Sequence, residues 1–337
     1  MVDLTTTYMG LSLRNPLVAS ASPLTGDVAT LRVLEDHGVA AVVLPSLFEE
    51  DVRRELRDCD RFLETEAGVA EVCGGFFPTV ETGGLVDHYL SLIKAAREAL
   101  DIPVIASLNG ISDVGWTDLV GQLASAGASA IELNLYRLPL DGALTGAEVE
   151  DTACGLVQRV RHATELPVAI KLNPYYSALA DMAARLAATG ADALVLFNRL
   201  YHPDIDPQRL RIANDVELSR RHEMRLPMLW LAALRGRVRV SLAASTGIET
   251  SDDVVRYLLA GADVVMSTSA LLRHGAPYAG DLLRGLTEWL DVRDFSNIEA
   301  VRGLLAEPQD GKISARERAA YRAQLQGYSG VRRALRH

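Results

Sequence analysis

The sequence predicts an α/β protein that folds as a (β/α)8 TIM barrel. The chain has 337 residues, a length that suits one large barrel. Its short apolar segments lack the alternation of half-exposed strands, as strands buried on both faces should. Amphipathic helical segments separate these strands along the chain. A doubly wound sheet is the structural alternative, but no predicted strand is followed by the Gly-x-Gly-x-x-Gly pattern of a dinucleotide site.

Glycine marks four of the junctions between a helix and the strand that follows it. At such a junction the residue after the helix takes a left-handed conformation, which glycine adopts without a Cβ clash. The four glycines are Gly38, Gly127, Gly190 and Gly261. The eight strands are expected to start near residues 16, 39, 102, 128, 167, 191, 238 and 262. Helices are expected between them, for instance at Val86–Leu100, Trp116–Ala126, Glu148–Ala163, Ala178–Thr189 and Asp252–Ala260.

We expect one domain over residues 1–337, with a barrel core at about 15–293. The segment Thr5–Leu13, with a bend at Gly10, predicts a β-hairpin before the barrel. Long insertions follow the second strand (47–84) and the sixth strand (200–236). Both leave the carboxyl ends of strands, where barrel enzymes build lids and pockets. Residues 294–337 are expected to form a helical tail outside the barrel.

Composition excludes several classes of protein. The chain has 34 basic and 44 acidic residues, a formal charge of −10, which argues against nucleic-acid binding. The sequence has no apolar run of membrane-spanning length, and its start lacks the pattern of a signal peptide. Cys59, Cys73 and Cys154 are far apart, which favours a reducing cytoplasm and predicts neither a disulfide framework nor a metal site.

Four predicted strands end in asparagine. These residues are Asn109, Asn134, Asn173 and Asn198. The carboxyl ends of parallel barrel strands share one face, so four carboxamides would converge there. An amide offers a donor and an acceptor together, which suits the edge of a planar heterocycle. The alternative is that each asparagine only ends its strand and forms a turn.

Lys171 lies inside an apolar strand, although lysine is rare in this chain, with three lysines among 34 basic residues. A buried cation is costly unless it is paired or used. Three interpretations stay open: Lys171 stabilises the anionic ring of a reduced flavin, forms a Schiff base, or pairs with Glu132 on the neighbouring strand.

Small residues end the last two strands, in Thr246-Gly247 and Thr268-Ser269. At these positions small residues let backbone N–H groups approach an anion, so the pair predicts a phosphate-binding site.

The order of these motifs resembles the dihydroorotate dehydrogenase family, whose members are flavoenzymes on an FMN-binding barrel. The resemblance runs over nearly the whole chain. Its best-matching segments are Asn15-Pro16-Leu17-Val18-Ala19-Ser20, Glu132-Leu133-Asn134-Leu135, Lys171-Leu172-Asn173-Pro174-Tyr175, Thr246-Gly247-Ile248-Glu249-Thr250 and Ala270-Leu271.

The resemblance implies FMN as cofactor and a role for each matching residue. Ser20 and Ala21 would contact the flavin, and Lys171 would face its N1–C2 edge. The ring and substrate would also meet Asn109, Asn134 and Asn198. The phosphate would be bound by Thr246, Gly247, Thr268 and Ser269.

The chain departs from the family pattern at the catalytic base, which is a Cys or Ser in the family. Arg137 stands at that position, and an arginine cannot act as a base. Tyr136 is our first candidate for proton transfer, and Arg137 is expected to clamp a substrate carboxylate. Other candidates near the strand ends are Tyr175, Tyr201 and His202. The family's strand-two lysine is replaced by Pro45, and its lid loop has no clear counterpart in residues 72–78.

These observations indicate a cytoplasmic FMN oxidoreductase of a dihydroorotate dehydrogenase-like branch. It would act on CH–CH bonds and exchange a hydride between flavin N5 and a dihydroorotate-like or other small planar substrate. The resemblance implies pyrimidine biosynthesis and an electron acceptor that the sequence does not identify. A homodimer is considered as the assembly, without nucleic acid, membrane or metal. Two alternatives remain: a flavin-binding protein that does not oxidise dihydroorotate, and a Schiff-base lyase that uses Lys171.

Overall fold

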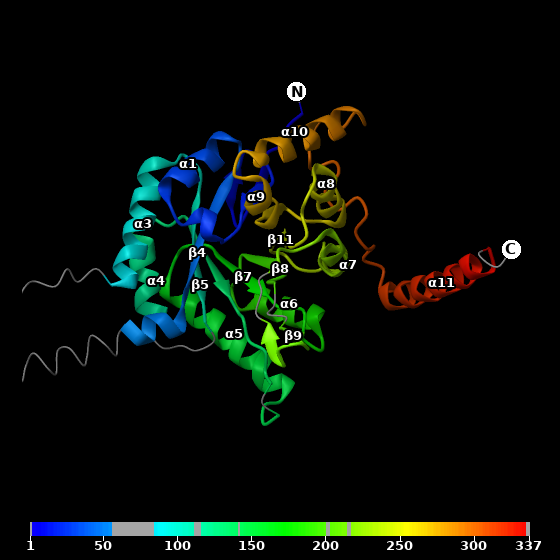
Figure 1. Ribbon diagram of the computed structural model, residues 1–337, viewed down its shortest axis with the longest axis horizontal. Coiled ribbons are helices and arrows are strands. Elements are labelled where there is room, and N and C mark those ends of the chain that lie inside the picture. The colour runs from blue at the N-terminus through cyan, green and yellow to red at the C-terminus, as the bar shows by residue number, and fades with distance from the viewer. Residues whose placement is uncertain are drawn as a thin grey trace, which may run out of the picture.

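The computed structural model describes residues 2–55, 84–110, 116–140, 142–199, 203–213 and 217–334. Eight parallel strands close into a barrel, which confirms the predicted fold class (Figure 1). Each strand pairs with the next, and the last pairs with the first. They start one to three residues after the expected positions. The strands are β3 (Leu17–Ala19), β4 (Ala41–Phe48), β5 (Val104–Asn109), β6 (Ala130–Asn134), β7 (Val168–Leu172), β8 (Ala193–Leu196), β11 (Ser241–Ser245) and β12 (Val264–Ser267).

Helices surround the barrel and pack on its outer surface (Figure 1). The four predicted junction glycines all have φ between +98° and +118°, so the left-handed conformation there explains why glycine is used. The helices are α1 (Val28–Asp36), α3 (Leu85–Ala99), α4 (Trp116–Ser125), α5 (Gly146–Ala163), α6 (Leu179–Ala188), α7 (Arg225–Leu234), α8 (Ser251–Ala260), α9 (Ser269–His274) and α10 (Tyr278–Asp291).

The predicted N-terminal hairpin is present as β1 (Thr6–Tyr8) and β2 (Leu11–Leu13). Met9 and Gly10 join the two strands, and both have positive φ, as the tight turn of a two-residue hairpin requires. Tyr8 is fully buried among inward-facing residues of the barrel strands. Met9 N donates to Ser241 Oγ at the start of β11. The hairpin therefore covers the amino end of the barrel and leaves the carboxyl end as the open face.

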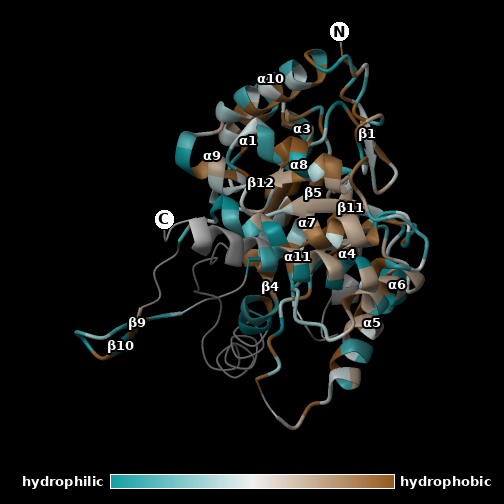
Figure 2. Cartoon of the chain, turned by 90° about the vertical axis from the view of Figure 1, so that its right-hand side faces the viewer, coloured by the Kyte–Doolittle hydropathy of each residue, from teal (hydrophilic) through white to brown (hydrophobic). Residues whose placement is uncertain are grey.

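The insertion after β8 contains a second hairpin, β9 (Asp204–Asp206) and β10 (Arg211–Ala213), and the short 3-10 helix η2 (Arg221–Met224). Figure 2 shows this hairpin standing away from the barrel. The insertion after β4 lies largely outside the described residues.

The C-terminal part begins with turns over residues 294–312 and ends in the long helix α11 (Ile313–Ala334). Figure 1 shows α11 extending away from the barrel. Among the described residues, no helix is long and apolar enough to cross a membrane.

Candidate functional site

The carboxyl ends of the barrel strands form one polar face, which we call the barrel mouth. Strand register places Asn109 beside Asn134 and Asn134 beside Lys171 on neighbouring strands. All three side chains point into the barrel. Strand residues two positions apart point to the same face, and the residues that precede these three at that spacing are buried inside the barrel. The structure thus brings the predicted polar residues of three strands to one level of the mouth.

Lys171 reaches across the interior of the barrel. Its Nζ lies 3.2 Å from Ser20 Oγ and 3.3 Å from Glu132 Oε1. Ser20 directly follows β3, and three strands separate β3 from β7 in either direction around the barrel. An ammonium group that contacts the opposite wall must lie near the barrel axis, directly below the mouth.

The Lys171–Glu132 ion pair is deeply buried, with side chains 9% and 1% exposed. Glu132 Oε2 has no hydrogen-bond partner among the described residues. The structural pair that the sequence offered as one interpretation therefore exists. It does not exclude a cofactor role, because Ser20 and Lys171 both face the mouth.

The four predicted carboxamides do not behave alike. Asn198 Nδ2 donates to Asn134 Oδ1 at 2.9 Å, so these two amides orient each other. Asn173 instead accepts from its own loop, with Tyr175 N 2.9 Å from its Oδ1. The turn interpretation therefore holds for Asn173. Asn109 is half-buried at the end of β5.

The predicted phosphate-binding residues of β11 and α9 converge on Ser219. Gly247 N donates to Ser219 Oγ at 3.0 Å, and the hydroxyls of Ser219 and Ser269 are 2.8 Å apart. Ser219 is buried and belongs to the insertion after β8. Ser219 could not be predicted from the sequence, because a serine among polar residues of a long insertion gives no signal of its own.

We call the group formed by Gly247, Thr268, Ser269 and Ser219 the predicted phosphate cradle. Gly247 is the position in this group that requires glycine. Its φ is +77°, and a Cβ there would lie 2.6 Å from Met224 Cγ and 2.8 Å from the Arg220 carbonyl oxygen. The segment that carries Ser219 can close over the end of β11 only because residue 247 has no side chain.

Thr246 and Thr268 flank this cradle. Thr246 Oγ1 donates to the Phe197 carbonyl at 3.3 Å, so its hydroxyl points to the end of β8. Tyr257 Oη donates to the carbonyl oxygens of Ser245 and Thr246 and fixes this strand end. Burial raises the pKa of Tyr257 well above its ordinary value. Thr268 directly precedes α9.

Tyr136 and Arg137 follow β6 at the mouth, and both are half-buried. The Arg137 carbonyl oxygen accepts from Asn173 Nδ2 at 3.4 Å, which ties the two loops together. Tyr175 is 60% exposed. Tyr201, His202 and the lid segment 72–78 lie outside the described residues. No group of His, Cys, Asp and Glu able to hold a metal ion occurs in the described part of the chain.

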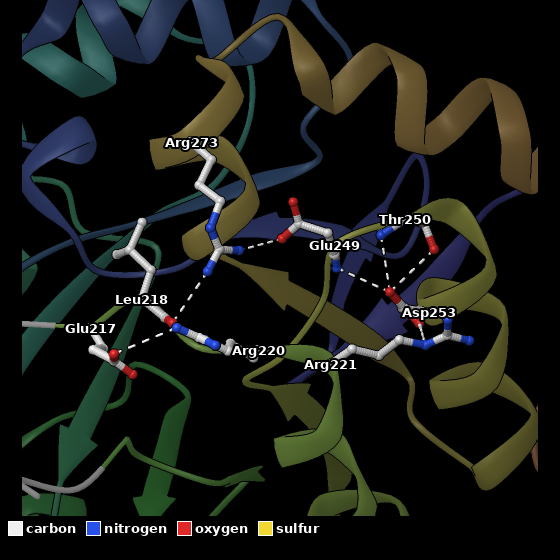
Figure 3. Close-up of a pocket in the computed structure, with 8 residues that line it drawn as sticks. All are labelled: Glu217, Leu218, Arg220, Arg221, Glu249, Thr250, Asp253 and Arg273. Carbon is white, nitrogen blue, oxygen red and sulfur yellow. Dashed lines mark hydrogen bonds and ion pairs between the residues drawn. The ribbon is translucent and has the colours of Figure 1, made fainter.

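A pocket of about 720 Å³ lies beside the predicted phosphate cradle (Figure 3). Arg273 reaches from α9 to Glu249 and to the carbonyl oxygens of Leu218 and Ser219, the latter at 2.8 Å. Arg273 therefore holds the segment that places Ser219. The pocket is lined by Glu217, Leu218, Arg220, Arg221, Glu249, Thr250, Asp253 and Arg273, so its acidic and basic side chains balance.

A lysine at the axis of a barrel, amides around its mouth and small residues at the ends of its last two strands are typical of the class of barrel enzymes that bind a phosphorylated ligand. The profile of one family in this class, described as dihydroorotate dehydrogenase, matches residues 3–290. The chain therefore belongs to the dihydroorotate dehydrogenase family. Members of this family are flavin-dependent oxidoreductases that act on CH–CH bonds.

Curated relatives agree with this assignment. The chain is 30% identical over 300 residues to the catalytic subunit of dihydroorotate dehydrogenase B (NAD(+)) of Desulforudis audaxviator, covering 86% of this chain and 94% of the relative. It is 26% identical over 307 residues to a putative dihydroorotate dehydrogenase A (fumarate) of Aeropyrum pernix, covering 89% and 97%.

Proposed function

We propose that this protein is an FMN-dependent oxidoreductase that acts on a small planar, anionic substrate related to dihydroorotate. The observation that carries the proposal is the position of Lys171 Nζ, near the barrel axis below the mouth and held by Ser20 and Glu132. A fixed positive charge at this place favours the anionic form of a reduced flavin. The hydrogen-bonded amides of Asn134 and Asn198 supply donors and acceptors beside it.

The residues present fit FMN. Its phosphate would be held by the cradle of Gly247, Thr268 and Ser269 together with Ser219, where a Cβ at residue 247 would prevent closure. The isoalloxazine ring would be held by Ser20, Ala21, Asn109, Asn134, Lys171 and Asn198. Bound FMN would supply hydride transfer at N5.

The substrate side of the mouth is formed by the loop after β6. Arg137 offers a guanidinium that binds a carboxylate through two parallel hydrogen bonds, so an anionic substrate suits this site. Because Arg137 occupies the position of the family's base, proton transfer falls to another group, and Tyr136 is the nearest candidate. Cys154, the family's alternative type of base, is buried in α5 and not in the loop after β6.

The relatives supply candidates for the electron acceptor of this chain. The names of the two relatives above specify NAD(+) and fumarate. We propose that a separate acceptor reoxidises the flavin of this chain. Assays with NAD(+), with fumarate and with a dye as the acceptor test this proposal. A cytoplasmic location remains our prediction.

A second function is favoured by one observation, the arginine at residue 137. A flavin-binding protein without dihydroorotate oxidation would explain the missing base directly. Visible absorbance of the purified protein tests both proposals, since each requires one FMN per chain. Anaerobic mixing with dihydroorotate then separates them, because only a dehydrogenase loses its flavin absorbance. A colourless protein that FMN cannot reconstitute would overturn both.

A further inference from the structure

Strand β4 contains an irregularity that changes which of its side chains face the interior of the barrel. Val43 pairs with Ile105 on β5, and the next pair is Ser46 with Ser107. Between these two pairs β4 advances three residues, from 43 to 46, while β5 advances two, from 105 to 107. One extra residue on one strand of a pair is a β-bulge, a feature that changes the direction of the side chains that follow it.

Pro45 lies inside this bulge. Proline has no backbone N–H to donate to a neighbouring strand, so it is tolerated where the pairing is already interrupted. Pro45 also stands at the position of the family's strand-two lysine. At this strand the chain therefore has a bulge and no lysine.

The contacts of β4 beyond the bulge show the new directions. Ser46 shares the inward direction of Ser107, and the Oγ atoms of the two residues lie 2.7 Å apart. Leu47 faces the helices, since it is buried with its partner Leu108 in the core outside the barrel. Phe48 follows Ser46 by two residues and therefore points inward. Without the extra residue, Leu47 would point inward and Phe48 toward the helices.

Phe48 extends the row of polar residues at the mouth. It pairs with Asn109, which pairs with Asn134, which in turn pairs with Lys171. Neighbouring strands lie about 4.8 Å apart, so the backbone of Phe48 is about 10 Å from that of Asn134. Asn134 and Lys171 are buried, whereas Phe48 is 47% exposed. The row thus ends in an aromatic ring that is accessible at the mouth.

Two flat groups bind at the mouth in the proposed function, the flavin and the substrate. The predicted phosphate cradle lies at the ends of β11 and β12, and β5 is four strands from β11 in either direction around the barrel. Strands β4 and β6 are the two neighbours of β5. Phe48 and the loop that carries Arg137 therefore lie on the same side of the mouth, away from β11. This is the side that the proposed function gives to the substrate.

We propose, on the basis of the proposed function, that Phe48 packs against the ring of the substrate while Arg137 binds its carboxylate. Aromatic rings favour stacked contacts with other flat rings, and a puckered ring of the same size makes fewer of them. A ring with polar groups around its whole edge, such as that of dihydroorotate, gains less, because polar groups lose water beside an apolar side chain. The substrate class is therefore a cyclic carboxylic acid with a planar, conjugated and largely apolar ring.

Calorimetric titration of the full-length protein with benzoate and with cyclohexanecarboxylate tests this assignment. The two anions have the same number of carbon atoms and the same charge, but only the ring of benzoate is planar. The wild type should bind benzoate more tightly. F48A should weaken benzoate binding by about threefold to tenfold and cyclohexanecarboxylate binding less, so that the preference is lost. F48L should also lose the preference, whereas F48Y keeps an aromatic ring and should retain it.

The matched control is Y321A, which removes a ring that is 58% exposed on α11, away from the barrel. It should leave both affinities unchanged. A wild type that binds neither anion, or binds both equally, would overturn the assignment, as would an F48A variant that keeps the preference.

The flavin is the competing contact for Phe48. If F48A lost FMN but kept the preference for benzoate, Phe48 would belong to the cofactor site and the assignment to the substrate would be wrong. Calorimetry needs no flavin signal. Flavin content, measured separately by absorbance, therefore tests the proposed function independently of the role of Phe48.

Discussion

Lys171 and Ser20 belong to opposite walls of the barrel, yet Lys171 Nζ lies 3.2 Å from Ser20 Oγ. This contact fixes the ammonium group at the barrel axis. Glu132 lies on the strand next to Lys171 and contacts the same nitrogen at 3.3 Å. Any anionic ring bound at the mouth therefore meets a positive charge that is partly balanced from below.

Lys171→Met should lower the reduction potential of the bound flavin, because the reduced anion loses its nearest positive charge. An electrostatic change of about 1–3 kcal/mol is reasonable for the partly buried pair of the Lys171 ammonium and the reduced flavin anion. Since Glu132 balances part of this charge, we expect the lower end of the range. Reductive titration of both proteins measures the difference. An equal potential in the two proteins would assign Lys171 to structure alone.

Glu132→Gln should shift the potential in the opposite direction. The amide keeps the size of the side chain but removes the negative charge below Lys171, so the ammonium acts on the flavin without compensation. The double variant with Lys171→Met should have nearly the same potential as Lys171→Met alone, because Glu132 acts through Lys171. Titrations of the two single variants and the double variant form one cycle. Additive shifts would show that Glu132 acts independently of the lysine.

Gly247→Val should release FMN from a barrel that remains folded. The added side chain would overlap Met224 and the Arg220 carbonyl at a residue whose φ is +77°, so the segment that carries Ser219 must move away. Gly142→Val is the control, since a Cβ at residue 142 meets no atom within 4 Å. Bound flavin after gel filtration and the circular dichroism spectrum are the measurements. If Gly247→Val kept its full flavin content, the residues around Gly247 would not form the phosphate-binding site.

The barrel could be predicted because it rests on local rules. A glycine after a helix carries its signal in one position, as the positive φ of Gly261 demonstrates. The phosphate-binding role of Gly247 stays a prediction. The role of Ser219 could not be predicted, because its contact with Ser269 joins residues 50 positions apart through an irregular insertion. Asn134 and Asn173 both follow a leucine of an apolar strand, but Asn134 accepts from Asn198 whereas Asn173 accepts from Tyr175 N in its own loop, a difference that tertiary packing decides.

Buried tyrosines make the protein sensitive to high pH. Burial raises the pKa of Tyr176 to about 12 and also raises the pKa values of Tyr8, Tyr89 and Tyr257 above their ordinary value. A raised pKa in the folded state means that stability is complete below the unfolded value of 10.0 and is lost as pH rises through the folded value. In an alkaline titration, the phenolate absorbance of these four should appear together with unfolding. Their ionisation in a protein that is still folded would contradict the burial.

We expect residue 137 to decide whether the protein oxidises dihydroorotate. With no base at residue 137, turnover should be absent or very slow at neutral pH, because general-base catalysis contributes ~10²–10⁴-fold. The flavin should still accept electrons from a chemical reductant, since that chemistry belongs to the cofactor. Arg137→Cys and Arg137→Ser should raise the rate only if the pocket accepts the substrate without the guanidinium. Arg137→Lys is the control, because it keeps the charge without providing a base at neutral pH.

Steady-state assays with dihydroorotate and with fumarate, NAD(+) or a dye as acceptor give the answer. Wild-type turnover at ordinary enzyme rates of ~1–10³ per second would mean that another group at the mouth has become the base. In that case Tyr136→Phe should abolish turnover while flavin content and potential stay unchanged, because the phenol would be needed for the proton and not for the cofactor. If Tyr136→Phe kept the full rate, the proton would have to pass to a different residue of the mouth, and our ranking of Tyr136 would be wrong.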